Sequence, residues 1–205
     1  MNTSTIFFRI TSSVMGGFLG SISMFLIYAF NFYFLGNSEN PITKLVLIFM
    51  VFTGSLIANL TSGAFLSMSY PEKYSRKSTM LWQAFLINMF LFLITFPFFT
   101  MLNEIQIVSI FQLLFSVLAT SIIYEIYSGS GTYTLTGLYG SLFGIFLIFI
   151  VINLIQTTAL SSILLFLSLP LIWLVVTIAI ILIEYLYSLF YKASGFAVFD
   201  PKTRL

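Results

Sequence analysis

The sequence contains no histidine and no cysteine, and Asp200 is its only aspartate. Without His, a Ser-His catalytic relay, an HExxH zinc site and a His-ligated haem are excluded. A single Asp excludes a paired-aspartate protease and a DxD sugar-nucleotide site. Without Cys there is no disulfide, no thiol nucleophile and no thiolate metal site. We therefore expect neither an enzyme nor a protein that holds a metal ion or another cofactor.

Charged residues are also scarce. They make up 7% of the chain, whereas hydrophobic residues make up 60%, and the mean hydropathy is +1.09. A water-soluble surface normally needs about a quarter of its residues charged. The net charge of +2 is too small and too scattered for a nucleic-acid surface. The sequence therefore predicts an integral membrane protein whose surroundings are a lipid bilayer and which has no nucleic-acid partner.

The apolar residues form long runs separated by short polar segments. At about 20 residues per crossing, the chain predicts an all-α fold of six transmembrane helices in a single domain covering 1–205. Residues 1–13 contain Arg9 among apolar neighbours, and this pattern predicts a short segment at the inner membrane interface. The expected spans are 14–36, 44–68, 80–102, 107–127, 135–155 and 160–191, followed by a cytoplasmic tail at 192–205.

The loop at 69–79 between the second and third runs predicts the orientation of the chain. It carries Glu72, Lys73, Arg76 and Lys77, and Lys and Arg collect on the cytoplasmic side of membranes. Six spans with both termini inside leave only Lys44 of the eight basic residues outside. The basic residues expected inside are Arg9, Lys73, Arg76, Lys77, Lys192, Lys202 and Arg204. The same loop is a candidate contact for a cytosolic partner.

Stripes of small residues predict which helices pack closely, because small side chains let helix backbones approach in a bilayer. Such stripes occur in the first, second and fifth spans, which we expect to form the packed centre. The third and sixth spans are rich in Phe, Leu, Ile and Val and are expected to face lipid, with Gln83 and Asn88 turned inward. The stripes contain Gly16 and Gly20, Gly54 and Ala58, and Gly140 and Gly144.

Glu125 and Glu184 are the acidic residues within the predicted spans, and each lies among tyrosines. Ionisable groups within spans are functional candidates, because their burial in a bilayer is unfavourable. One interpretation is a carboxylate pair that binds a cation or proton on a transport route. The other is a pair of interfacial carboxylates, matched with Lys73, Arg76 or Lys77.

The length of the last apolar run favours the interfacial interpretation of Glu184. About 20 residues from Leu160 cross the hydrocarbon, so Glu184 is expected at or beyond its inner boundary. There, water and Lys192 would satisfy the carboxylate.

Uncharged polar residues also recur within the spans. Asn59 can line a polar pathway, or it can join helices by hydrogen bonds. Gln112 begins a line that continues with Ser116, Thr120 and Tyr124, four residues apart and therefore on one helix face. Asn59 and Gln112 are the uncharged candidates for a functional role.

Two functions of different classes fit these observations. The first is a permease or transporter subunit that moves an unidentified substrate. The second is a structural or accessory subunit of a larger membrane complex. Both imply other membrane subunits or a second copy of the chain as partners, and we expect a plasma or inner membrane rather than an organelle.

Overall fold

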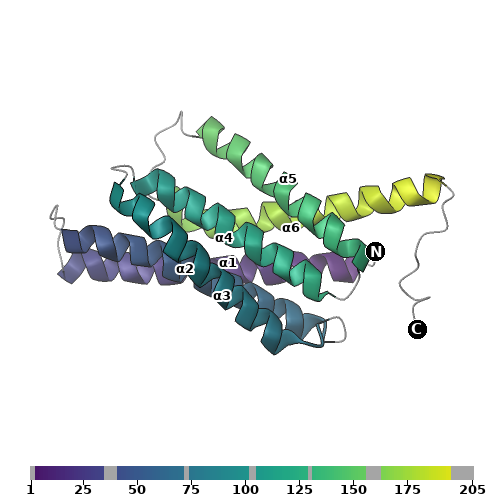
Figure 1. The fold of residues 1–205 in the computed structure, drawn as a ribbon, viewed down its shortest axis with the longest axis horizontal. Coiled ribbons are helices and arrows are strands. Elements are labelled where there is room, and N and C mark those ends of the chain that lie inside the picture. Colours follow the sequence, from purple (N-terminus) through teal and green to yellow (C-terminus); the bar gives the residue numbers. More distant parts are fainter. Residues whose placement is uncertain are drawn as a thin grey trace.

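A computed structural model of the protein describes residues 3–34, 41–71, 74–101, 105–128, 131–155 and 163–194. Over these residues the fold is all-helical, which confirms the predicted class, and the helices form an elongated bundle (Figure 1). The helices are α1 Thr3–Phe34, α2 Pro41–Ser69, α3 Lys77–Met101, α4 Ile105–Tyr127, α5 Gly131–Ile155 and α6 Ile163–Ser194.

Five of these helices are long and apolar enough to cross a membrane, and α5 has a shorter apolar stretch at Thr136–Ile150. Local sequence explains two of the helix ends. Pro41 is the first residue of α2, where a missing N–H is tolerated. At the end of α4, the Ser128 backbone N–H donates to the Glu125 carbonyl over 3.2 Å, and the Ser128 hydroxyl donates to it over 2.7 Å. The chain is therefore a multi-pass membrane protein by the length and composition of its helices.

The first helix differs from its prediction. α1 is one continuous helix from Thr3, so residues 3–13 are not a separate interfacial segment. Arg9 lies in its second turn and is buried. The prediction placed Arg9 at the membrane interface because an arginine among apolar neighbours is typical of an interfacial segment. In the structure, carboxylates from two other helices compensate its charge.

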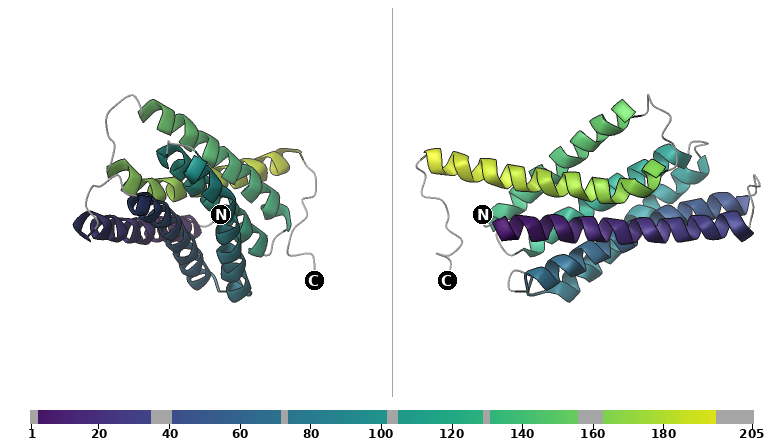
Figure 2. Two further views of the ribbon diagram at one scale, coloured as in Figure 1. Left: turned by 60° about the vertical axis from the view of Figure 1, so that its left-hand side comes forward. Right: turned by 180° about the vertical axis from the view of Figure 1, so that it is seen from behind.

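Each helix packs against some of the others, and α4 contacts α2, α3, α5 and α6. α1 and α2 run side by side along much of their length, and α6 packs against α1 on one side and α5 on another (Figures 1 and 2). α4 lies between α5 and the α2–α3 pair. At the end of the bundle where α1 begins, α6 continues beyond the other helices (Figure 2).

The small residues of α1 and α2 meet as predicted. A β-carbon added at Gly20 would lie 2.5 Å from both the Ala58 Cβ and the Gly54 carbonyl oxygen. A β-carbon at Gly16 would lie 2.5 Å from the backbone nitrogen of Ser62. Real β-carbons do not approach so closely, so glycine at these positions allows the two backbones to touch.

The predicted role of the fifth span is wrong, and so is that of the sixth. Gly140 and Gly144 of α5 pack against Ile180 and Val176 of α6, rather than against α1 and α2. The sixth helix does not face lipid alone, because one of its faces is buried in the bundle while the other is exposed. A helix of large apolar residues packs closely when its neighbours supply the glycines. The buried apolar residues of α6 are Leu169, Ile172, Trp173, Val176, Ala179 and Ile180.

α3 lies at the outside of the bundle, as expected. Most of its side chains are exposed, whereas Met80, Ala84 and Asn88 form a narrow buried stripe. Asn88 turns inward as predicted, but Gln83 does not. Gln83 is exposed and lines a shallow groove of about 330 Å³ between α3 and α4.

Candidate functional site

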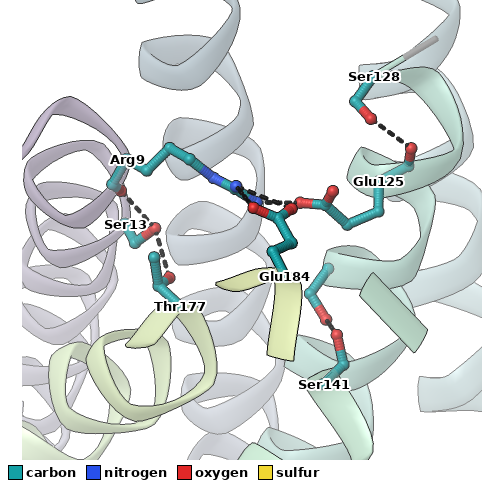
Figure 3. A network of polar contacts seen from close by, with 8 residues as sticks. Arg9, Ser13, Glu125, Ser128, Ser141, Thr177 and Glu184 are labelled. Atoms are coloured by element: carbon teal, nitrogen blue, oxygen red, sulfur yellow. Dashed lines mark hydrogen bonds and ion pairs between the residues drawn. The ribbon is translucent and has the colours of Figure 1, made fainter. Parts of the chain in front are cut away.

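A buried ion cluster joins three helices at one end of the bundle. Arg9 of α1 lies between Glu184 of α6 and Glu125 of α4 (Figure 3). The Arg9 Nη1 donates to Glu184 Oε1 and Oε2 over 3.0 and 2.9 Å, and Nη2 donates to Glu125 Oε1 over 2.5 Å. All three side chains are 4–6% exposed. We refer to Arg9, Glu125 and Glu184 as the Arg9 cluster.

The cluster lies where α1 begins, α4 ends and α5 begins. Glu125 is in the last turn of α4, and Gly137 of α5 packs directly against it. A β-carbon added at Gly137 would lie 2.5 Å from the Glu125 Cβ, so glycine here leaves room for the carboxylate. Glu184 lies well before the end of α6, which continues to Ser194.

The surroundings of Glu125 and Glu184 differ from those that the interfacial interpretation predicted, in exposure and in partner. Both carboxylates are buried rather than exposed to interfacial water. Both pair with Arg9, and the described basic residues of the loop, Arg76 and Lys77, are exposed. Glu184 was expected at or beyond the membrane boundary because helix length alone was counted. In the structure the surrounding helices cover it, whatever its depth.

A chain of hydroxyl groups adjoins the cluster. Thr177 of α6 donates to the Ser13 hydroxyl over 2.8 Å, and Ser13 donates to the Arg9 carbonyl over 2.9 Å (Figure 3). Beside these groups is a cavity of about 20 Å³, enough for about one water molecule. Its lining includes Arg9, Ser13, Ser121, Tyr124, Glu125 and Thr177. The ion cluster therefore borders a small, partly open space whose wall combines these polar groups with the apolar Leu66, Trp173 and Ile180.

The loop between α2 and α3 covers this end of the bundle. Tyr74 is 2% exposed although it lies outside the helices, and its backbone N–H donates to the Tyr70 carbonyl over 3.1 Å. Burial raises the pKa of the Tyr74 phenol above its ordinary value, and the negative charge of Glu125 raises it further. The loop is thus fixed by a buried tyrosine while Arg76 and Lys77 point to solvent or headgroups. Glu72 and Lys73 lie outside the described residues.

A second, uncharged network lies in the middle of the helices. Asn59 of α2 donates to the Asn88 Oδ1 over 2.8 Å and to the Ser116 Oγ over 2.6 Å. Asn88 donates to the Thr120 Oγ1 over 2.9 Å, and the Trp173 indole donates to the Asn59 Oδ1 over 3.1 Å. These five residues, the Asn59 network, join α2, α3, α4 and α6.

The predicted polar line on α4 faces inward along its whole length. Gln112, Ser116, Thr120 and Tyr124 are all buried. Tyr124 donates to the Asn59 carbonyl, while the Thr95 hydroxyl of α3 donates to the Gln112 Oε1 over 2.5 Å. Ser116 and Thr120 belong to the Asn59 network, whereas Gln112 bonds separately to α3 and is not part of the Arg9 cluster.

Arg9 and Tyr74 are the site residues that sequence reasoning missed. Glu125 and Glu184 were recognised as unusual because acidic residues are rare in spans, but neither was matched to Arg9. One signal was present: from Ile6 to Phe34 only Arg9 interrupts an otherwise uncharged run. One basic and two acidic residues within apolar runs already suggest a buried ion cluster. Comparison with protein-family models, curated proteins and solved structures finds no match to this chain.

Proposed function

We propose that the protein is a membrane-embedded permease or transporter subunit with six spans and both termini on the cytoplasmic side. The Arg9 cluster is the observation that carries this proposal. Removing charges from water is unfavourable, and well-packed apolar residues often replace a buried ion cluster with no loss of stability. Stability alone therefore gives no reason to keep Arg9, Glu125 and Glu184 between three membrane helices. Ionisable groups within spans instead mark ion and substrate routes.

The cluster is also suited to a helix bundle that changes shape. Its three members come from α1, α4 and α6, so any movement of one helix relative to another changes an ion pair. The cavity beside it holds about one water molecule, too little for an organic solute. Passage of a substrate therefore requires these helices to separate, and the described structure corresponds to a closed arrangement.

Accessibility of the cavity tests this proposal without knowledge of the substrate. The chain has no Cys, so Ser121→Cys or Thr177→Cys introduces a single thiol beside the cluster. An alternating permease exposes this thiol to each side in turn. A membrane-impermeant maleimide should then label it in intact cells and also in inside-out vesicles.

A matched control is Ser55→Cys, because Ser55 is buried in α2 and does not line the cavity. It should resist the reagent from both sides. Cavity thiols that react from one side only, or from neither, would contradict the transporter proposal and favour a structural subunit.

The alternative, an accessory subunit of a larger membrane complex, is favoured by the outer face of α3. Gln83 is an exposed amide in an otherwise apolar groove lined by Leu86, Ile87, Phe90 and Ile123. Amides form hydrogen bonds across helices within membranes, so a transmembrane helix of a partner subunit suits this groove. Gln83→Cys should then crosslink to that partner in native membranes, and Leu93→Cys on the same helix is the control.

The loop at 69–79 is our proposed contact for a cytosolic partner. Tyr74 fixes it against the bundle, while Arg76 and Lys77 are exposed and free to meet acidic groups. Purification in mild detergent tests this directly. A soluble protein that co-purifies with the wild type and is lost with Arg76→Glu/Lys77→Glu would support the contact.

A further inference from the structure

We propose that the cavity beside the Arg9 cluster binds an uncharged hydroxyl group, and that small uncharged alcohols are the substrates of the permease proposed above. This substrate class rests on that proposed function. Three features of the cavity wall select it. The hydroxyl hydrogens of the wall are used within the protein, Arg9 supplies donors, and the space is small with an apolar part.

The hydroxyl groups that α1 and α6 contribute to the wall have already placed their hydrogens. Thr177 donates to the Ser13 Oγ over 2.8 Å, and Ser13 donates to the Arg9 carbonyl over 2.9 Å (Figure 3). A hydroxyl group has one hydrogen and two lone pairs. Thr177 and Ser13 both line the cavity, so they offer a ligand lone pairs but no hydrogen.

The hydroxyl groups of α4 on the wall are used in the same way. The single hydrogen of Ser121 is shared between the Leu118 carbonyl, at 2.9 Å, and the Ser141 Oγ, at 2.8 Å. Tyr124 donates to the Asn59 carbonyl. Ser121 and Tyr124 line the cavity too, so all the hydroxyl oxygens of the wall act as acceptors toward a ligand. An anion needs donors and finds none among these hydroxyl groups.

Arg9 supplies the donors of the wall. A guanidinium has five N–H hydrogens, and the ion pairs with Glu184 and Glu125 comprise three hydrogen bonds. The Trp173 indole N–H, also on the wall, donates to the Asn59 Oδ1 over 3.1 Å. A cation is disfavoured here, because it would lie beside the guanidinium with which both carboxylates already pair. The wall therefore selects an uncharged ligand that both donates and accepts.

A hydroxyl group matches these requirements. It donates its hydrogen to an oxygen of the wall and accepts a hydrogen from Arg9. The cavity of about 20 Å³ has room for one group of this size. An amine would make the same contacts, but amines are protonated at neutral pH and are excluded with the other cations. The ligand is therefore uncharged and hydroxylic.

The rest of the wall suits a carbon skeleton better than water alone. It consists of Leu66, Trp173 and Ile180, and the Trp173 ring stacks on Tyr124 with the ring centroids 6.1 Å apart. Contact with such groups is favourable for the carbon atoms of an alcohol, whereas water gains nothing from it. When the helices separate during transport, these side chains form the surface beside the bound hydroxyl group.

Counterflow exchange in proteoliposomes tests the substrate class. Vesicles containing the full chain are preloaded with unlabelled glycerol, erythritol, choline or lactate and then receive the same solute labelled with ¹⁴C. All of these probes carry hydroxyl groups, but choline is a cation and lactate is an anion. After subtraction of protein-free vesicles, glycerol or erythritol should exchange at least about tenfold faster than either charged probe, because a charge is unfavourable in such a site. Faster exchange of choline or lactate, or no exchange of any probe, would overturn the proposal.

A change to the cavity wall tests the site itself. Thr177→Val removes one acceptor oxygen and should slow exchange of the uncharged probes by about three- to tenfold, the effect of one hydrogen bond. Thr95→Val is the matched control, since Thr95 also bonds between helices, to Gln112, but does not line the cavity. It should leave the exchange rate unchanged. If Thr177→Val folds poorly, Ser121→Ala removes an acceptor of α4 and should give the same loss. A folded cavity variant that exchanges as fast as the wild type would show that the cavity is not the binding site.

The labelling of cavity thiols separates this proposal from the proposed function. Thiols that react from both sides, together with exchange of choline or lactate alone, would support transport and overturn the uncharged substrate. Thiols that react from one side only, together with no exchange of any probe, would remove transport itself and the substrate class with it.

Discussion

The Asn59 network and the Arg9 cluster both join several helices through buried polar groups, but they differ in charge and position. The Asn59 network is neutral, and both amides in it donate and accept hydrogen bonds. It lies midway along α2, α3 and α4. The Arg9 cluster is ionic, and it lies where α1 begins and α4 ends. The neutral network satisfies its polar groups by hydrogen bonds between helices, whereas the cluster buries charges at a desolvation cost.

The largest expected effect comes from breaking the cluster at its centre. Arg9→Gln removes the positive charge with which the two buried carboxylates pair. Loss of one partner from a buried ion pair costs about 3–5 kcal/mol, so we expect a large fall in folded yield and in the unfolding midpoint in detergent. Lys77→Gln is the matched control, since Lys77 is exposed. A stable Arg9→Gln protein would show that the cluster does not hold the helices together.

A smaller effect is expected in the Asn59 network. Asn88→Leu removes the acceptor for Asn59 and the donor to Thr120, and unsatisfied buried partners cost about 1–3 kcal/mol. Gln83→Leu makes the same chemical change on the exposed face of α3 and should alter stability by less than about 0.5 kcal/mol. Equal effects on the unfolding midpoint would mean that the network contributes nothing specific.

In both regions the sequence predicts which residues are unusual, but it does not predict their partners. The helices and the candidates Glu125, Glu184 and Asn59 follow from hydropathy and from the rarity of polar groups in spans. The partners do not, because sequence spacing relates residues of one helix only. Arg9 and Glu184 are far apart in the chain, and only tertiary packing brings them together. The close packing of α6 against α1 and α5 was missed for the same reason, since its neighbours, rather than its own sequence, supply the glycines.

The loop beside the cluster gives a pH-dependent test. Burial raises the folded-state pKa of Tyr74 above its unfolded value. Below about pH 10, the ordinary tyrosine pKa, Tyr74 is protonated in both the folded and the unfolded chain, so its burial contributes fully to the free energy of unfolding. Above that pH the unfolded chain loses the proton first, and stability falls by up to about 1.4 kcal/mol per pH unit.

Tyr74→Phe should flatten this alkaline fall in the unfolding midpoint, because phenylalanine has no proton to lose. Tyr33→Phe, at a position 79% exposed, is the control and should leave the profile unchanged. The same alkaline slope in both variants would show that Tyr74 is not held neutral beside the cluster.

The smallest expected effect on stability comes from replacing the whole cluster with apolar residues. In Arg9→Met/Glu125→Leu/Glu184→Met no charge remains buried, so the desolvation cost disappears together with the ion pairs. Such replacements are often neutral or stabilising, and we expect the unfolding midpoint to stay within about 1 kcal/mol of the wild type. If the cluster serves transport, the folded apolar variant should lose the labelling of a thiol at Ser121 from both sides, whereas Asn88→Leu should keep it. If the thiol in the apolar variant is still labelled from both sides, transport does not need the cluster. Arg9, Glu125 and Glu184 would then have a structural role only, like that of the Asn59 network.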